Sequence, residues 1–182
     1  MASVFAHGLV AVTAGRISLL TSRPGRFWTL GIICSIIPDA DVAGFGFGVS
    51  YRDFWGHRGI THSFFFALIL ALMVATVFFR HSRPFSREWA GLAAYFFVCT
   101  ASHGALDAMT NGGLGVAFFS PFENGRYFLP WRPIQVAPIG VAGFFSEWGV
   151  RVIVSEAVWV GIACAILLTL AARLKRTTPD KP

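Results

Sequence analysis

The sequence predicts an all-α, polytopic helical membrane protein, because it is unusually apolar, contains several long apolar stretches and places most of its arginines between them. Of its 182 residues, 55% are hydrophobic and 13% are charged, whereas an ordinary soluble domain has roughly 25% charged residues. This composition excludes a disordered chain and most soluble folds. The length allows one domain. We expect residues 1–176 to form a single integral membrane domain and residues 177–182 a disordered tail.

Five apolar stretches approach the roughly 20 residues that cross a bilayer core as a helix. They are Val4–Leu20, Phe27–Ile37, Phe64–Phe79, Trp89–Thr110 and Val152–Ala172. The second is the weakest candidate, because it has only eleven residues before Pro38. It can be a half-span, so the sequence predicts about five membrane segments and leaves four open.

The basic residues set the expected orientation. Nine of the 15 Lys and Arg residues fall in three alternating clusters: Arg23 and Arg26; Arg80, Arg83 and Arg87; and Arg173, Lys175, Arg176 and Lys181. The two opposite connections, 38–61 and 111–149, hold only four. Since short loops rich in these residues stay cytoplasmic, we expect the N-terminus outside and the C-terminus inside. The net charge of +6 then reflects topology, and we expect no nucleic-acid partner.

The connection 111–149 is too aromatic for a solvated linker. It contains nine aromatic residues: Phe118, Phe119, Phe122, Tyr127, Phe128, Trp131, Phe144, Phe145 and Trp148. Aromatic rings favour the headgroup level of a membrane. We therefore expect this stretch to fold back on the outer surface as an aromatic-rich interfacial cap.

The rare histidines and aspartates gather on one side of this topology. Seven of them fall at the outer ends of the apolar stretches: His7, Asp39, Asp41, His57, His62, His103 and Asp107. At about 1.5 Å of rise per residue, four separate stretches bring such a group roughly 20 to 27 Å above the cytoplasmic arginines. Ionisable groups at this depth cost several kcal/mol unless they are paired or bound, so they indicate a functional site.

Histidine and carboxylate ligands without a thiolate suit zinc, and also manganese or iron. We expect one or two divalent ions, most readily zinc, held by six residues: His7, Asp39, His57, His62, His103 and Asp107. Asp41, the spare carboxylate beside a ligand, is the predicted general base. Arg58 is predicted to stabilise charge on a phosphoryl oxygen.

Each motif also has a simpler explanation. His103 and Asp107, four residues apart on one helical face, can be a hydrogen-bonded pair. Pro38-Asp39-Ala40-Asp41 can be a turn, and Asp41 can be a ligand instead of a base. His57 and His62 can be interfacial side chains, and His7 can be a packing residue.

Several other polar residues have open or negative assignments. His81 lies in a cytoplasmic cluster, so we predict no catalytic part for it. Arg126 and Arg132 can hold a phosphate or simply reach the interface. Glu123 can be a further ligand or base, and Glu156 either pairs with Arg151 or faces the site.

Taken in order, these motifs resemble the YdjM-like family of membrane-bound metal-dependent hydrolases. The resemblance covers most of the chain: it begins at His7, includes Pro38-Asp39-Ala40-Asp41, His57-Arg58-Gly59-Ile60-Thr61-His62-Ser63 and His103-Gly104-Ala105-Leu106-Asp107, and ends at Ser120-Pro121-Phe122. It implies a location in the cell inner membrane and hydrolase activity.

More distantly, the order His, Asp, His and then HxxxD looks like the ligand order of zinc-dependent phospholipase C. That likeness implies hydrolysis of a phosphodiester at a lipid headgroup. This chain lacks the further histidines and the glutamate of that enzyme's three-metal set, so a reduced centre and a different substrate stay open.

The sequence therefore predicts a membrane-embedded metal-dependent hydrolase that acts on a phosphoester or ester of a lipid or other membrane-associated substrate. The main alternative is a metal-ion transporter or sensor with its site at the outer interface, and a non-enzymatic scaffold is a second. Transport requires polar residues along a path through the bilayer. Stretches 64–79 and 89–110 offer mostly apolar residues below the site, which favours the hydrolase.

Overall fold

The computed structural model describes residues 1–177 except 19 and 21–23, so the expected tail lies almost entirely outside the described residues. The elements in order are α1 (Val4–Ile17), α2 (Gly25–Ile36), the 3-10 helix η1 (Ile37–Phe47), the 3-10 turn η2 (Ile60–His62), α3 (Phe64–Phe78), α4 (Arg87–Ala108), α5 (Val141–Phe144), α6 (Glu147–Glu156), the π-helical turn η3 (Ala157–Gly161) and α7 (Ile162–Thr177). Within this described part the chain forms helices and two isolated β-bridges but no strand. The predicted all-α class is confirmed.

Serine side chains start three of the long helices. The hydroxyls of Ser3, Ser63 and Ser86 accept hydrogen bonds from backbone amides in the first turns of α1, α3 and α4. Such caps satisfy amides that have no partner inside the helix. They fix where each helix begins, and for α3 this start lies directly beside His62.

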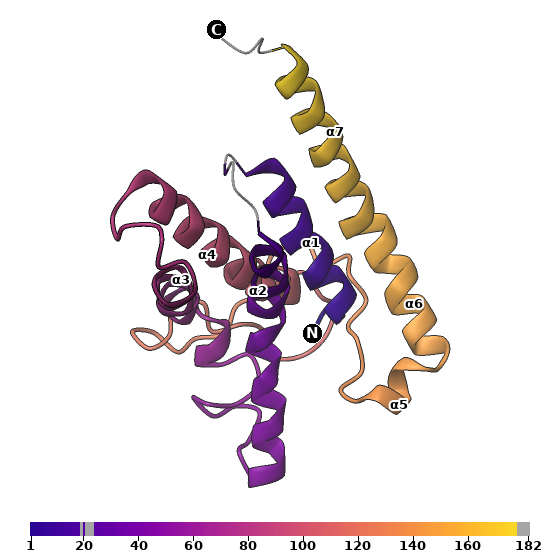
Figure 1. Ribbon diagram of the computed structural model, residues 1–182. Helices are drawn as coiled ribbons and strands as arrows, with labels where there is room; N and C mark the ends of the chain where they lie inside the picture. Colours follow the sequence, from indigo (N-terminus) through magenta and orange to yellow (C-terminus); the bar gives the residue numbers. More distant parts are fainter. Residues whose placement is uncertain (19, 21–23, 178–182) are drawn as a thin grey trace, which may run out of the picture.

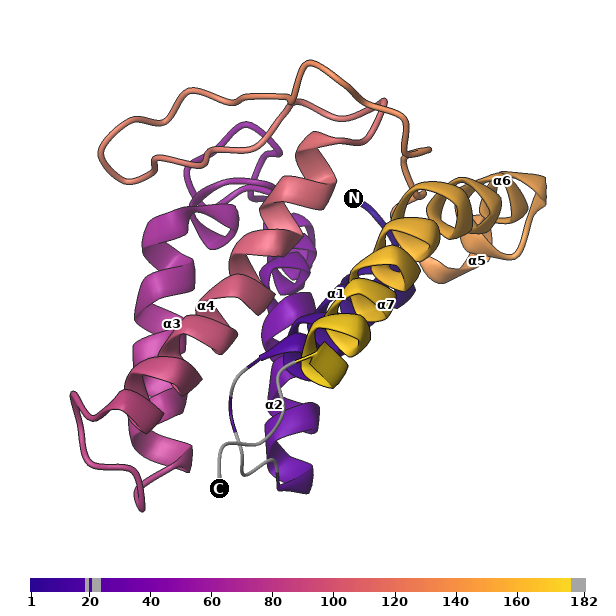
Figure 2. The ribbon, with the colours of Figure 1, turned by 90° about the horizontal axis from the view of Figure 1, so that it is seen from above.

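Helices α1 to α4 pack together as a bundle, and α6, η3 and α7 form one long helix that packs along α1 (Figures 1 and 2). The bundle core is apolar and aromatic. The ring of Phe27 stacks on Tyr95 with centroids 4.1 Å apart, and Phe96 packs against Phe79 at 5.5 Å. Small residues such as Ala71 and Ala75 are fully buried where α3 faces its neighbours, which lets helices approach closely.

Two helical stretches are long and apolar enough to cross a membrane: Gly25–Phe47 and Glu147–Leu174. Val4–Ile17 and Phe64–Phe78 are shorter apolar helices. A helix forms within each of the five predicted segments, but five full spans are not confirmed. The stretch expected to be weakest, Phe27–Ile37, belongs to one of the two that qualify, because the backbone continues past Pro38 as η1 instead of ending there.

The chain direction brings the start of α1, the end of α2, the start of α3 and the end of α4 to one end of the bundle, which we call the cluster end. The opposite end, with Arg26, Arg80 and Arg87, is the basic end. Segment 111–140 runs across the cluster end (Figure 2). Its backbone is bonded to the tops of the helices, from Phe64 N to Phe118 O and from Leu129 N to Ala108 O. The predicted cap thus covers this end, while its contact with a membrane surface stays a prediction.

Candidate metal centre

Four of the predicted ligands meet at the cluster end. Asp39, His62, His103 and Asp107 are buried and each offers one ligand atom within 4.8 Å of the others. Asp39 Oδ1 lies 3.3 Å from His103 Nε2 and 3.6 Å from His62 Nε2. His62 Nε2 lies 3.1 Å from His103 Nε2 and 3.7 Å from Asp107 Oδ2. Two imidazoles and two carboxylates at this spacing match the ligand set that binds zinc.

Local structure explains why these side chains converge. Pro38 is at the start of η1, so Asp39 falls in its first turn immediately beyond α2. His62 ends η2 just before the Ser63 cap of α3. His103 and Asp107 are four residues apart on α4, and residues at that spacing share one helical face.

Hydrogen bonds orient both histidines towards the shared point. His103 Nδ1 lies 2.7 Å from the carbonyl oxygen of Ser35, and a carbonyl can only accept. Nδ1 therefore carries the proton, and Nε2 presents its lone pair to the cluster. The Nδ1 of His62 lies 3.0 Å from Thr61 Oγ1 and 3.2 Å from Asp41 Oδ2, which leaves Nε2 facing Asp39. Metal-binding histidines are typically fixed through their other ring nitrogen in this way.

The cluster contains buried polar atoms that the rest of the chain does not satisfy. Both carboxylate oxygens of Asp39, both ring nitrogens of His7 and Asp107 Oδ2 have no hydrogen-bond partner among the described residues. Leaving such atoms buried and unpaired costs about 1–3 kcal/mol each. A divalent cation among them would remove that cost, so the residues present fit a metal ion.

The charge balance points the same way. Burial alone lowers the pKa of His62, yet the neighbouring carboxylates of Asp39 and Asp41 outweigh burial and raise that pKa to about 9. The carboxylates thus draw a positive charge into the site. A bound cation can supply the same charge in place of a proton.

Asp41 contacts the ligands rather than the point they share. Its Oδ1 lies 2.7 Å from His57 Nδ1, and its Oδ2 accepts a hydrogen bond from Thr61 Oγ1 at 2.7 Å and another from Arg58 N at 3.2 Å. Its side chain is 2% exposed. With both oxygens engaged, Asp41 is placed to position His57 and His62. The sequence-based role of general base stays a prediction, and this geometry does not favour it.

His57 and His7 lie at the edge of the four-residue group. His57 forms a second possible group with Asp41 and His62, and its Nε2 is buried without a partner. The ring of His7 stacks on His103 with centroids 3.8 Å apart, and its Nε2 lies 3.8 Å from Asp107 Oδ1. His57 can therefore hold an ion with Asp41 and His62, whereas His7 belongs to neither group of possible ligands among the described residues.

Arg58 is fully buried and its guanidinium is already engaged. Its Nε lies 2.9 Å from Asp107 Oδ2, an ion pair whose atoms are not aligned for a hydrogen bond. Its other nitrogens donate to Thr110 Oγ1 and to the carbonyl of Gly112, each at 3.0 Å. Gly113 has φ +91° and lies so close that a Cβ there would be 2.6 Å from the guanidinium. The arrangement positions Asp107, and the contact of Arg58 with a phosphoryl oxygen stays a prediction.

The structure shows the contacts of the polar residues whose roles the sequence left open. The carboxylate of Glu156 accepts from the backbone amide and hydroxyl of Ser3, so it anchors the start of α1 instead of pairing with Arg151. Glu123 accepts from Tyr127 Oη at 2.7 Å in the cap. Arg126 donates to carbonyls of residues 51, 53 and 57, and Arg132 lies over the ring of Phe128.

His81 lies at the basic end, as expected, with its Nε2 3.6 Å from a Glu88 oxygen and its Nδ1 3.3 Å from Arg26.

Sequence reasoning missed the groups that hold the ligands in place. They are the Ser35 carbonyl, the Thr110 hydroxyl and the backbone amide of Ala2, which donates to Asp107 Oδ1 at 2.6 Å. Backbone groups leave no trace in a sequence. The Thr61 hydroxyl, which contacts Asp41 and His62, could have been found from the sequence. Thr61 directly precedes His62, and a hydroxyl next to a ligand is a natural hydrogen-bond partner for that ligand.

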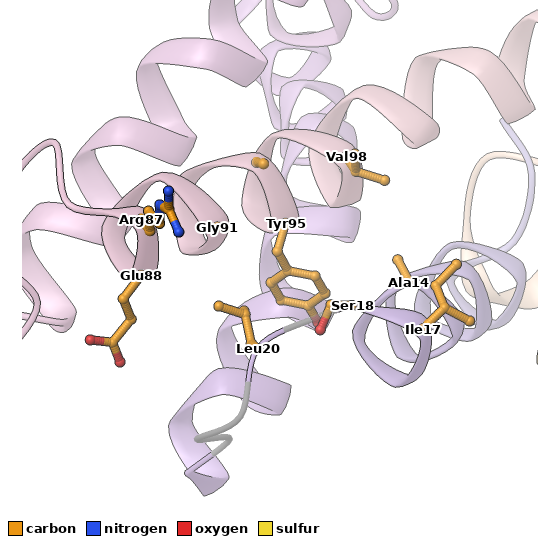
Figure 3. A pocket seen from close by; sticks show the side chains of 10 residues that line it. Ala14, Ile17, Ser18, Leu20, Arg87, Glu88, Gly91, Tyr95 and Val98 are labelled. Atoms are coloured by element: carbon orange, nitrogen blue, oxygen red, sulfur yellow. The ribbon is translucent and has the colours of Figure 1, made fainter. Parts of the chain in front are cut away.

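A large groove of about 660 Å³ lies elsewhere, between α1 and α4 (Figure 3). Its lining includes Ala14, Ile17, Gly91, Tyr95 and Val98, with Arg87 and Glu88 at one side. None of the cluster residues lines it. The volume of a cavity therefore does not identify the candidate site in this protein; the ligand geometry does.

Comparison with known proteins agrees with the membrane character of the chain. The sequence profile of the family described as "YdjM inner membrane protein" matches residues 1–178. The chain is also similar to "Inner membrane protein YbcI" of Escherichia coli (strain K12), with 36% identity over 173 residues that cover 92% of this chain and 95% of that protein. No solved structure gives a significant match.

Proposed function

The chain belongs to the YdjM family of inner membrane proteins, and on that premise we propose that it is a membrane-embedded metal-dependent hydrolase. The ion is held by Asp39, His62, His103 and Asp107, with His7 and His57 adjacent. Zinc is the first choice for this ligand set, and manganese or iron are the others. The expected substrate is a phosphoester or ester of a lipid or other membrane-associated molecule.

One observation carries the proposal. Buried donor atoms from η1, η2 and α4 converge on one point, and several of them have no partner in the described part of the chain. A purely structural cluster would pair its polar atoms internally, because unpaired buried groups destabilise a fold.

When bound, the ion supplies Lewis acidity, which lowers the pKa of water and polarises an ester or phosphoryl oxygen. The chain does the rest. The Ser35 carbonyl and Asp41 keep the histidine Nε2 atoms turned to the ion, and Arg58 keeps Asp107 in place. The cap segment excludes bulk water from the site.

The lipid substrate follows from position. The cluster lies at one end of a bundle whose outward faces are apolar, with Ile69 and Leu170 each 50% exposed. A site at the end of membrane helices lies at headgroup depth. The distribution of arginines supports the proposal that this end lies outside the cytoplasm, with the N-terminus out and the C-terminus in.

The alternative function is a metal-ion transporter or sensor. It needs polar groups leading from the cluster to the basic end. The core below the cluster instead consists mainly of buried apolar residues such as Phe27, Leu70, Val74, Leu92 and Phe96. This favours a site that binds without conducting.

Elemental analysis of the purified protein tests the proposal. We expect bound divalent metal in the wild type and in His81→Ala, and none in the His103→Ala, Asp107→Ala double variant. Metal-loaded protein should release a headgroup or acyl product from lipid vesicles, and the double variant should not. Equal metal content in the wild type and the double variant would remove the premise, and metal flux in proteoliposomes without hydrolysis would favour the transporter.

A further inference from the structure

Two neighbouring cavities on the outside of the cluster end differ in character. One is a groove of about 530 Å³ between α3, α4 and the cap. Six phenylalanines dominate its lining: Phe64, Phe65, Phe97, Phe118, Phe119 and Phe122. The other is a pocket of about 120 Å³ lined by polar groups of Arg52, Asp53, Asn124 and Arg126. Ser120 lines both, so the apolar groove and the polar pocket meet at one residue.

The polar pocket has an excess of positive charge. Within the described residues, neither Arg52 nor Arg126 forms an ion pair with a carboxylate, and Asp53 uses one of its oxygens to accept from Ser50 N at 2.7 Å. Ser120 Oγ donates to Asn124 Oδ1 at 2.7 Å, which leaves the Asn124 amide as a donor. The Nη atoms of Arg126 already donate to three backbone carbonyls, so Arg126 contributes mainly its positive charge. An anion with several oxygens matches this charge together with the Arg52 guanidinium and the Asn124 amide.

The phenylalanine groove is open at the outer surface of the helix bundle. Phe65 is 40% and Phe122 is 83% exposed, although their rings contact each other edge to face at 5.7 Å. Large exposed aromatic side chains at the end of an apolar helix are typical of a surface covered by lipid. A hydrocarbon chain is the natural occupant of such a groove in a protein of this family.

Both cavities also touch the backbone that carries the metal ligands. Arg126 donates to the carbonyl of His57, and Ala117 N donates to the carbonyl of Arg58. Phe118 lies against Gly104, next to His103. A molecule bound in the two cavities therefore contacts the segments that hold the cluster.

We propose that the groove and the pocket together bind one anionic phospholipid, with its phosphate at Arg52 and Arg126 and one acyl chain along the phenylalanines. This inference deepens the proposed function. The lipid binding itself does not depend on that function; only its purpose, to dock the lipid substrate beside the metal centre, rests on it. Docking through a phosphate and an acyl chain commits the substrate class to phospholipids, in preference to neutral lipids or soluble phosphoesters.

Native mass spectrometry of the full-length protein in mild detergent, titrated with dioleoyl phosphatidylglycerol, tests the assignment. One arginine near an anionic lipid is worth about 1 kcal/mol, so Arg52→Gln should weaken binding about fivefold. Phe122→Ala should weaken it by a similar factor through lost acyl contact. The matched controls are Arg132→Gln in the cap and Phe47→Ala, whose side chain is 88% exposed outside the groove; both should bind like the wild type.

Dioleoylglycerol, which lacks the phosphate, should bind more weakly than phosphatidylglycerol, and inorganic phosphate should not displace the lipid at equal concentration. Unchanged affinity in Arg52→Gln and Phe122→Ala, or equal losses in the controls, would overturn the assignment. Displacement by inorganic phosphate would identify a free-anion site instead. Metal content is measured on the same samples: lipid binding with this residue dependence but no metal would refute the proposed function alone, and metal with no such dependence would refute the lipid site alone.

Discussion

The two ends of the α1–α4 bundle differ in what they bury. At the basic end, Phe27, Phe79 and Tyr95 fill the space between the helices with rings, and the charged groups stay at the surface. At the cluster end, the same helices and their extensions enclose His7, Asp39, His62, His103 and Asp107, all 6% exposed or less. Rings pack without further partners, whereas imidazoles and carboxylates need a hydrogen bond or an ion. The comparison teaches that stability and function are separated along the helix axis.

The largest effect that sharpens this comparison is expected at the basic end. Phe96 is fully buried between Phe27 and Phe79, so Phe96→Ala should lower the free energy of unfolding by about 3–5 kcal/mol through lost packing. Metal content per folded molecule should not change. Thermal unfolding in detergent and elemental analysis measure the two quantities.

Phe78→Ala is the control for that variant, because Phe78 is 46% exposed on α3 and its loss should leave unfolding almost unchanged. If Phe96→Ala released the metal while remaining folded, the two ends would not be separable in the way the packing indicates.

The second effect concerns the positioning of the ligands at the cluster end. Asp41→Asn removes the carboxylate that contacts Nδ1 of both His57 and His62, and loss of such an outer partner lowers metal affinity about 10- to 100-fold. The melting temperature of the metal-free protein should stay close to that of the wild type. Competition with a chelator of known affinity measures the change.

Asp53→Asn is the matched control, since Asp53 is exposed and its contact is with Ser50 N. Asp41→Asn with wild-type metal affinity and a large loss of activity would restore the general-base role predicted from the sequence.

The smallest effect tests how closely the two polar segments approach each other. A Cβ on Gly104 would lie 2.8 Å from the backbone oxygen of His62, so Gly104→Ala should force a shift and cost about 1–3 kcal/mol. Metal affinity should fall as well, because the shift separates His103 from His62. Thermal unfolding with and without added zinc measures both.

Gly8→Ala, also inside a helix and next to a cluster histidine, has open space, with its nearest neighbour at 3.9 Å. It should be neutral or stabilise α1 by up to about 1 kcal/mol. Equal effects of the two alanines would show that the close approach at Gly104 is not a constraint.

Much of the candidate site could be predicted from the sequence, because isolated ionisable residues in apolar stretches have few roles. Asp39, His62, His103 and Asp107 were expected together and lie together. The roles of Asp41 and Arg58 were harder, because a role depends on which atom faces which. Asp41 directs its oxygens to histidine Nδ1 atoms, and Arg58 directs its donors to Asp107, Thr110 and Gly112.

The membrane segments show the same division. The apolar stretches predicted helices, and helices form there, but Pro38 misled the estimate of length for the second one. Proline ends an α-helical hydrogen-bond ladder, yet it is accepted at the first turn of a new helix. The chain uses it to begin η1, so a stretch of 23 residues, Gly25–Phe47, qualifies as a span where eleven were counted.

The sequence by itself determined that the chain is helical and apolar. It also determined that arginines and lysines gather at one end of the apolar stretches and histidines and aspartates at the other, because these properties depend only on residue type and spacing. The tertiary structure alone decided which ring nitrogens face the shared point and which carboxylate supports them. Those choices depend on the Ser35 carbonyl, the Ala2 amide and the close approach at Gly104. Every residue has a backbone carbonyl and an amide, so only their positions in space, and not their presence in the sequence, can set the geometry of the site.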